Sequence, residues 1–241
     1  MEIIRVNSYE EMSKTACKQI VNQLRQSDRS VLGLATGSTP EGLYQQLIDQ
    51  YKEGNVSFQH VTTFNLDEYV GLAADDPNSY RYYMNEKLFR HIDLPDNKAF
   101  LPRGDVDDPE KECQDYEALI KDAGHVDLQV LGLGLNGHIG FNEPGTSFGS
   151  RTHMVTLDES TRQANARFFP TLDDVPKKAI TMGIDTIMES KKIVLLVSGE
   201  KKADAVNQLV NGEVTEEFPA SILQKHPNAV LIADEGALSK L

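Results

Sequence analysis

Short runs rich in Val, Ile and Leu alternate with longer amphipathic segments along the whole chain. Several of these runs are almost continuously apolar, which is typical of parallel strands covered on both faces. The alternation predicts an α/β fold: an open, mostly parallel, Rossmann-like sheet with helices on both faces. The expected strands are Glu2–Val6, Val31–Ala35, Val61–Asn65, Ala99–Leu101, Leu128–Leu133, His153–Leu157, Ala179–Met182, Ile193–Ser198 and Ala229–Ala233.

Capping residues mark the starts of several helices. Ser8, followed by Glu11, forms a capping box ahead of an apolar repeat. Thr39-Pro40 offers a capping hydroxyl and a proline at the first helical position, and Asp76-Pro77 and Asp108-Pro109 repeat this signal. We therefore expect a helix to begin at each of these places.

Composition excludes several classes of function. The 241 residues carry 24 Lys and Arg against 37 Asp and Glu, a formal net charge of −13, so no basic excess exists with which to bind nucleic acid. Cys17 and Cys113 stand far apart without ligand spacing, which indicates buried thiols in a reducing compartment. No apolar run is long enough to span a membrane, and the N-terminus lacks a signal-peptide pattern. We expect a cytoplasmic protein with one domain over residues 1–241, because no linker divides the chain.

The loop after the second expected strand has the composition of an anion site. Open α/β sheets bind ligands outside the carboxyl ends of their strands, so such loops are where chemistry is expected. Gly37 allows a ligand to approach the backbone closely. The free N–H groups of a helix start, with the hydroxyls of Ser38 and Thr39, could bind a phosphate. The alternative is a simple turn with a helix cap.

Two adjacent carboxylates, Asp67 and Glu68, follow the next strand. Neighbouring residues of an extended segment point to opposite sides, so one of the two can face a cleft. A carboxylate there could act as a general base or a metal ligand, or it could simply be an exposed loop acid.

Residues 132–145 form a glycine-rich loop. Its first three glycines match the G-x-G-x-x-G fingerprint of dinucleotide sites, but further glycines and Pro144 predict a loop where that site requires a helix. What remains is a loop that presents Asn136, His138 and Glu143 together. A lone histidine is more often structural, whereas histidine beside a carboxylate is a common acid–base pair near neutral pH.

Two cationic side chains are further candidates. Lys202 follows a strand and a glycine in a first helical turn, where a lysine opposes the helix dipole unless an anion is bound nearby. Arg167 ends a polar segment, residues 161–167, and could contact a phosphate. A solvated surface is the alternative for both.

Five segments carry a family pattern: Thr36–Pro40, Asn65–Tyr69, Asn136–Pro144, Ser150–Thr152 and Asn165–Phe169. Together they closely resemble glucosamine-6-phosphate deaminases, also called isomerases, over nearly the whole chain. The resemblance implies the sheet of the sugar-phosphate deaminase/isomerase type. It also implies reversible conversion of D-glucosamine 6-phosphate and water into D-fructose 6-phosphate and ammonia, without a metal ion or organic cofactor.

The resemblance implies a role for each candidate residue. Asp67 corresponds to the base that moves a proton between C2 and C1, and His138 to the group that opens the sugar ring. Glu143 would hold the imidazole and share its proton. Asn136, which is Asp in many relatives, would orient His138 without lending it charge. The phosphate would be bound by Gly37, Ser38, Thr39, Arg167 and Lys202.

Regulation and assembly are also implied. His153 and Val155 stand where allosterically activated relatives have basic residues, and those relatives have a longer C-terminal tail. We therefore expect no activation by N-acetylglucosamine 6-phosphate, and a monomer or small homo-oligomer. A mobile lid is expected around residues 153–182.

Two other functions compete with this one. A 6-phosphogluconolactonase shares the fold and binds a sugar phosphate, but does not need Asp67 together with His138 and Glu143. A non-catalytic sugar-phosphate sensor domain would accompany a basic helix-turn-helix segment, for which a first strand beginning at Glu2 leaves no room.

Overall fold

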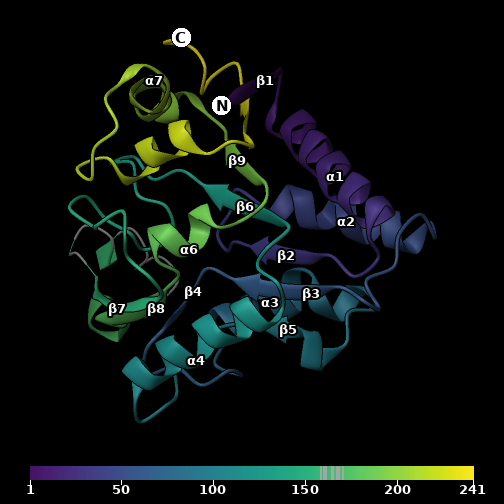
Figure 1. Ribbon diagram of the computed structural model, residues 1–241, viewed down its shortest axis with the longest axis vertical. Helices are drawn as coiled ribbons and strands as arrows, with labels where there is room; N and C mark the ends of the chain where they lie inside the picture. Colours follow the sequence, from purple (N-terminus) through teal and green to yellow (C-terminus); the bar gives the residue numbers. More distant parts are fainter. Residues whose placement is uncertain (158, 160–161, 164–165, 167–168, 170) are drawn as a thin grey trace.

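A parallel seven-stranded sheet forms the centre of the structure, a computed structural model that describes residues 1–157, 159, 162–163, 166, 169 and 171–241 (Figure 1). Its strands are β1 (Glu2–Val6), β2 (Val31–Leu34), β3 (Thr62–Asn65), β5 (Ala99–Phe100), β6 (Leu128–Gly132), β9 (Ile193–Val197) and β10 (Ala229–Asp234). They lie in the order β1-β10-β9-β6-β2-β3-β5. The chain leaves β2 towards β3 and β5, and later runs from β6 to β9 and β10 on the other side. The strand order therefore reverses between β2 and β6, whose carboxyl ends flank the crevice where such sheets bind ligands.

Helices cover both faces of this sheet, as predicted (Figure 1). The α-helices are α1 (Tyr9–Gln26), α2 (Glu41–Lys52), α3 (Tyr80–Lys87), α4 (Pro109–Asp122), α6 (Ile184–Met188) and α7 (Ala203–Asn211). Alternate strand residues point to opposite faces: Val130 packs in the core beneath α1, α2 and α3, and Leu131 in the core beneath α4, α6 and α7. Short 3-10 turns are η1 (Phe89–His91), η2 (Asp96–Lys98), η4 (Leu172–Asp174), η5 (Glu200–Lys202) and η6 (Pro219–Lys225).

A second, three-stranded antiparallel sheet was not predicted. It consists of β4 (Asp67–Tyr69), β8 (Lys178–Thr181) and β7 (His153–Thr156), in the order β4-β8-β7. The runs expected at residues 153–157 and 179–182 are strands, but they belong to this sheet. Leu66 joins the two sheets, because its N–H donates to Leu34 O at 3.2 Å and its carbonyl accepts from Met182 N–H at 2.7 Å.

Ser8 and Asp108 begin helices as predicted. The Ser8 hydroxyl accepts a hydrogen bond from Glu11 N–H at 3.2 Å, and the Asp108 carboxylate accepts one from Lys111 N–H at 3.0 Å. The Glu11 carboxylate, however, binds the backbone N–H of Asn7 at 2.7 Å rather than that of the capping serine.

Two other predicted helix starts are wrong. Pro40, not Thr39, takes the capping position of α2, without a side-chain cap. Asp76 stabilises a turn, where its carboxylate accepts from Asn78 N–H at 2.8 Å. Helix α3 begins after Ser79, which takes the capping position and whose hydroxyl accepts from Tyr82 N–H at 3.0 Å.

Three further expectations concern the loops and the cysteines. Residues 133–152 continue as a loop, with no helix after the glycine-rich motif, so the dinucleotide interpretation is rejected. Cys17 and Cys113 are free and buried, as predicted.

The single domain over residues 1–241, with a lid around residues 153–182, stays a prediction. Within that segment the structure describes β7, η4 and β8, and residues 158, 160–161, 164–165, 167–168 and 170 lie outside the described part.

Candidate active site

The loop at the end of β2 is a tight turn held by two tyrosines. Gly37 has a φ of +92°, a backbone conformation that favours glycine, and both Gly37 and Ser38 are exposed. The Tyr83 hydroxyl donates to Gly37 O at 2.6 Å, and the Tyr9 hydroxyl donates to Ser38 O at 2.9 Å. No described residue accepts from the N–H groups of Gly37, Ser38 or Thr39. The turn thus offers donors to an anion while its carbonyl oxygens are already engaged.

Replacing Tyr83 by phenylalanine tests whether this turn binds the substrate. The loss of one hydrogen bond of about 1 kcal/mol should raise KM for a sugar phosphate about fivefold and leave kcat within about twofold. Tyr82→Phe is the matched control, because Tyr82 neighbours it on α3 but faces Arg90, whose guanidinium carbon lies 6.0 Å from the ring centroid. Equal steady-state constants for the two variants would contradict a role for the turn.

Asp67 is buried in β4, with 6% of its surface exposed. Its neighbour Glu68 is turned towards α3, where it accepts from the N–H groups of Tyr80 and Arg81, as expected for adjacent residues of a strand. Burial, reinforced by the negative charge of Glu68, raises the pKa of Asp67 to about 8. Gly140, at a φ of +58°, is next to this carboxylate: a Cβ atom there would be 3.5 Å from Asp67 Oδ2 and only 2.9 Å from the Thr181 hydroxyl oxygen. The absence of a side chain at Gly140 thus leaves room for the Thr181 hydroxyl, which lies beside Asp67.

Strand β8 brings Asp67 and the glycine-rich loop together. Thr181 pairs with Asp67 across the small sheet, and its hydroxyl accepts from Phe141 N–H at 3.1 Å. The buried Asn142 side chain donates to Met182 O at 2.8 Å, directly after the strand. Asp67 and the glycine-rich loop, which lie more than 60 positions apart in the sequence, are therefore both held by β8.

An aromatic cluster encloses the other side of Asp67, and sequence reasoning missed it. The Tyr69 and Tyr80 rings lie 4.8 Å apart, and Tyr80 stacks on Phe141 at 6.1 Å with an interplanar angle of 8°. The Tyr80 hydroxyl also donates to the Tyr69 hydroxyl at 3.3 Å. The signal available in the sequence was the tyrosine-rich start of α3 at residues 80–83. Tyr69 and Tyr80 lie near enough to Asp67 that its negative charge helps to raise the pKa of both hydroxyls.

Asn136 lies between His138 and Glu143 and orients both. Its side-chain nitrogen donates to Glu143 Oε2 at 2.6 Å, and its side-chain oxygen is 2.7 Å from His138 Nδ1. Because an ionised carboxylate only accepts, the amide oxygen must face the imidazole, and Nδ1 must carry the proton. The lone pair of the neutral imidazole is therefore on Nε2, where it can take a proton from a substrate. Glu143 Oε2 is 3.5 Å from Nδ1, so the amide, rather than Glu143, is the direct partner.

Lys202 reaches the base of the same loop. Its ammonium donates to Leu133 O at 2.5 Å, and burial lowers the pKa of Lys202. The β9 exit that carries it is held by Asp234, which accepts from the Ser198 hydroxyl and, at 3.0 Å, from Gly199 N–H. Asp234 was not predicted, and nothing in its local sequence distinguishes it.

Arg167, the other expected phosphate ligand, lies outside the described residues. In the part of the chain that the structure describes, no three His, Cys, Asp or Glu side chains gather closely enough to hold a metal ion.

Residues 7–232 match the family described as glucosamine-6-phosphate isomerases/6-phosphogluconolactonase. The chain belongs to this family. A glucosamine-6-phosphate deaminase of Shouchella clausii is 60% identical to it over 99% of this chain and 97% of the relative. Glucosamine-6-phosphate deaminase 1 of Bacillus subtilis is 54% identical over 99% of each chain.

A solved structure of a monomeric glucosamine-6-phosphate deaminase superposes with a TM-score of 0.98, at 54% identity and over 100% of both chains. The resemblance seen in the sequence motifs and the α/β fold class are thereby confirmed. The glucosamine-6-phosphate isomerase family includes lactonases by its description, and the relatives at high identity carry the deaminase name.

Proposed function

We propose that the protein converts D-glucosamine 6-phosphate and water into D-fructose 6-phosphate and ammonia. One observation carries the proposal: strand β8 joins the buried base Asp67 to the loop that holds the His138–Asn136–Glu143 chain. The proposal assigns Asp67 as the base and His138 as the acid–base group, beside the crevice expected where the strand order reverses between β2 and β6. The names of relatives at 54–60% identity over nearly the full length support the same reaction.

Ring opening is the step for His138. The stable form of the substrate is a closed pyranose, so O1 must lose a proton and O5 must gain one. In the tautomer that Asn136 holds, Nε2 can accept the O1 proton and then deliver it to O5. Glu143, behind the amide, stabilises the imidazolium that forms between these two transfers.

Proton transfer from C2 to C1 is the step for Asp67. In the open form, the C2 proton is acidified by the neighbouring C1 carbonyl, and the ionised Asp67 removes it. The same carboxyl group returns the proton to C1, which leaves an imine at C2. Water adds to that imine and ammonia leaves, so the products are the ketose phosphate and ammonia. A raised pKa suits the carboxylate to this task, because a stronger base removes a carbon-bound proton more readily.

Phosphate binding orients the reacting end. We assign the phosphate to the N–H groups and hydroxyls of Gly37, Ser38 and Thr39, with Lys202 and Arg167 as counter-charges. Since the phosphate is remote from C1 and C2, its binding energy lowers the entropic part of the barrier without entering the chemistry. No step requires a metal ion or organic cofactor.

Ammonia release separates this reaction from its alternatives. Purified protein should release ammonia from D-glucosamine 6-phosphate and form fructose 6-phosphate in equal amount, and should not accelerate hydrolysis of 6-phosphogluconolactone. Lactone hydrolysis without ammonia release would establish the lactonase reaction instead. Binding of the sugar phosphate without turnover would establish a sensor.

We propose a monomer in the cytoplasm. The solved relative is described as monomeric, and the large apolar side chains exposed in the described part of this chain are few. They are Met1, Tyr9, Leu119, Leu135 and Leu241. Of the helices that the structure describes, none is long and apolar enough to cross a membrane.

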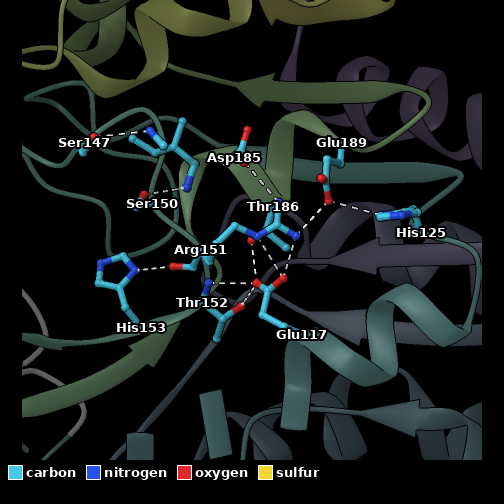
Figure 2. A network of polar contacts seen from close by, with 12 residues as sticks. Glu117, His125, Ser147, Ser150, Arg151, Thr152, His153, Asp185, Thr186 and Glu189 are labelled. Carbon is cyan, nitrogen blue, oxygen red and sulfur yellow. Dashed lines mark hydrogen bonds and ion pairs between the residues drawn. The ribbon is translucent and has the colours of Figure 1, made fainter. Parts of the chain in front are cut away.

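We expect no activation by N-acetylglucosamine 6-phosphate. His153 turns its Nδ1 to Arg151 O at 2.7 Å, and the nearby Arg151 guanidinium is surrounded by three carboxylates (Figure 2). These are Glu117, Asp185 and Glu189, at 2.7, 3.2 and 2.8 Å. A guanidinium that is already neutralised attracts a second phosphate weakly. The substrate saturation curve should therefore be the same with and without N-acetylglucosamine 6-phosphate, and a lowered half-saturation concentration would contradict this.

A further inference from the structure

Glu68 is a buried carboxylate that the proposed steps do not use. It is 3% exposed, although a carboxylate is rarely buried without partners. Its Oε1 accepts from the N–H groups of Tyr69 at 2.8 Å and Tyr80 at 2.9 Å, and its Oε2 accepts from Arg81 N–H at 2.9 Å. Tyr80 and Arg81 are the first two residues of α3. One side chain thus binds the strand that carries Asp67 to the start of a helix.

We propose that Glu68 is a positioning residue: it anchors β4 to α3 so that Asp67 faces the crevice, and it holds the negative charge that keeps Asp67 a strong base. The inference rests on the proposed function, because Asp67 must act as the base. Strand β4 is short and, among the described strands, pairs with β8, so the two hydrogen bonds from Tyr80 and Arg81 to Glu68 are its link to α3.

The hydrogen bonds decide which carboxyl group of the pair carries the charge. Burial raises the pKa of Glu68, but Glu68 also accepts one backbone N–H from β4 and two from the start of α3, beside the positive charge of Arg81, and these contacts favour its ionised form. Asp67 accepts no hydrogen bond from a described residue. The first proton taken up by the pair therefore goes to Asp67.

The other titratable groups that face Asp67 are tyrosines. Tyr69 lies on its own strand, Tyr80 on α3 and Tyr116 on α4, and burial raises the pKa of all three hydroxyls, that of Tyr69 to about 12. They are uncharged wherever the enzyme would work. Across β8 and the glycine-rich loop, Asp67 faces Thr181 and Asn142, which do not titrate. Burial is the main cause of the raised pKa of Asp67, and Glu68 is the charge, among the described residues, that adds to it.

Glu68→Gln and Glu68→Asp separate the charge from the geometry. Glutamine removes the charge and turns an amide nitrogen towards Arg81 N–H. In the pH profile of kcat/KM for D-glucosamine 6-phosphate, the acidic limb should therefore move to lower pH by about one unit. Aspartate keeps the charge but is shorter, so the limb should stay in place while kcat falls. Substrate ionisation is common to all three proteins and cancels in the comparison. A limb that stays fixed in Glu68→Gln, with only a lower melting temperature, would show that Glu68 is merely structural.

The parent protein provides a second test that needs no altered Glu68. With carboxyl-¹³C labels assigned through Asp67→Asn, the Asp67 signal should titrate at higher pH than the Glu68 signal, and the reverse order would overturn the inference. Wild-type protein that binds D-glucosamine 6-phosphate without releasing ammonia would instead disprove the proposed function. The two failures are therefore distinguishable.

Discussion

Asp67→Asn is expected to reduce the turnover of D-glucosamine 6-phosphate by about a thousandfold and to change KM little. Asparagine has nearly the same shape as aspartic acid, so the pocket beside Gly140 and the aromatic cluster should persist. An amide cannot remove the C2 proton, and exchange of that proton with deuterated water should be lost together with turnover. Steady-state assays and proton NMR of the substrate measure both.

The matched control is Asp127→Asn. Asp127 is a partly buried carboxylate at the amino end of β6, where it accepts from Val31 N–H at 2.7 Å, far along the sheet from the proposed site. The Asp127→Asn variant should retain both turnover and exchange of the C2 proton. Unimpaired C2 exchange in Asp67→Asn would remove Asp67 from the role of base, whatever happened to the overall rate.

Asp67→Asn should also stabilise the folded protein at high pH. The pKa of Asp67 is raised from 3.8 to about 8 on folding, so between these values the folded chain binds a proton that the unfolded chain does not. The free energy of unfolding therefore falls as the pH rises through this window. Asp67→Asn should match the parent in melting temperature near pH 4 and exceed it above pH 8. A higher melting temperature with lost turnover would mark Asp67 as a group retained for function at the expense of stability.

Most of the main sheet could be predicted because strands such as β2, β9 and β10 are apolar runs long enough to show in the sequence. The small sheet could not. Strand β4 has three residues, two of them acidic, and it is a strand because Glu68 accepts backbone N–H groups of α3 and because β8 lies beside it. Such long-range partners leave no local pattern. The wrong helix start at Thr39 has a related cause: the tyrosines that hold the β2 exit come from α1 and α3, and they shape the turn before Pro40.

The candidate site was predicted by residue type more fully than by geometry. Asn136, His138 and Glu143 lie within eight residues of sequence, and the structure brings them into one chain of contacts. The sequence could not show that the amide lies between the other two, because this depends on the course of the loop. Lys202 reaches that loop only because β9, which precedes Lys202, pairs with β6, which precedes Leu133. The Lys202 ammonium then donates to the Leu133 carbonyl oxygen.

His138→Gln should have the second large effect, and a selective one. Glutamine can keep a hydrogen bond to Asn136 but cannot accept a proton and pass it on near neutral pH. Turnover of the cyclic substrate should fall by about a hundredfold or more. Turnover of an analogue that lacks the O5 hydroxyl, and so cannot close to the pyranose, should fall far less, because Asp67 performs the C2-to-C1 step independently of the imidazole.

The comparison of the two substrates identifies the step rather than only the residue. His60→Gln is the control, since His60 is exposed near the amino end of β3 and should affect neither substrate. Equal slowing of both substrates in His138→Gln would show that His138 acts after the ring has opened, for example when water adds to the imine. Selective slowing would instead tie the Asn136-held tautomer to ring opening. Asn136→Ala should then share that selectivity in weaker form, because an imidazole without its amide partner adopts the required tautomer only part of the time.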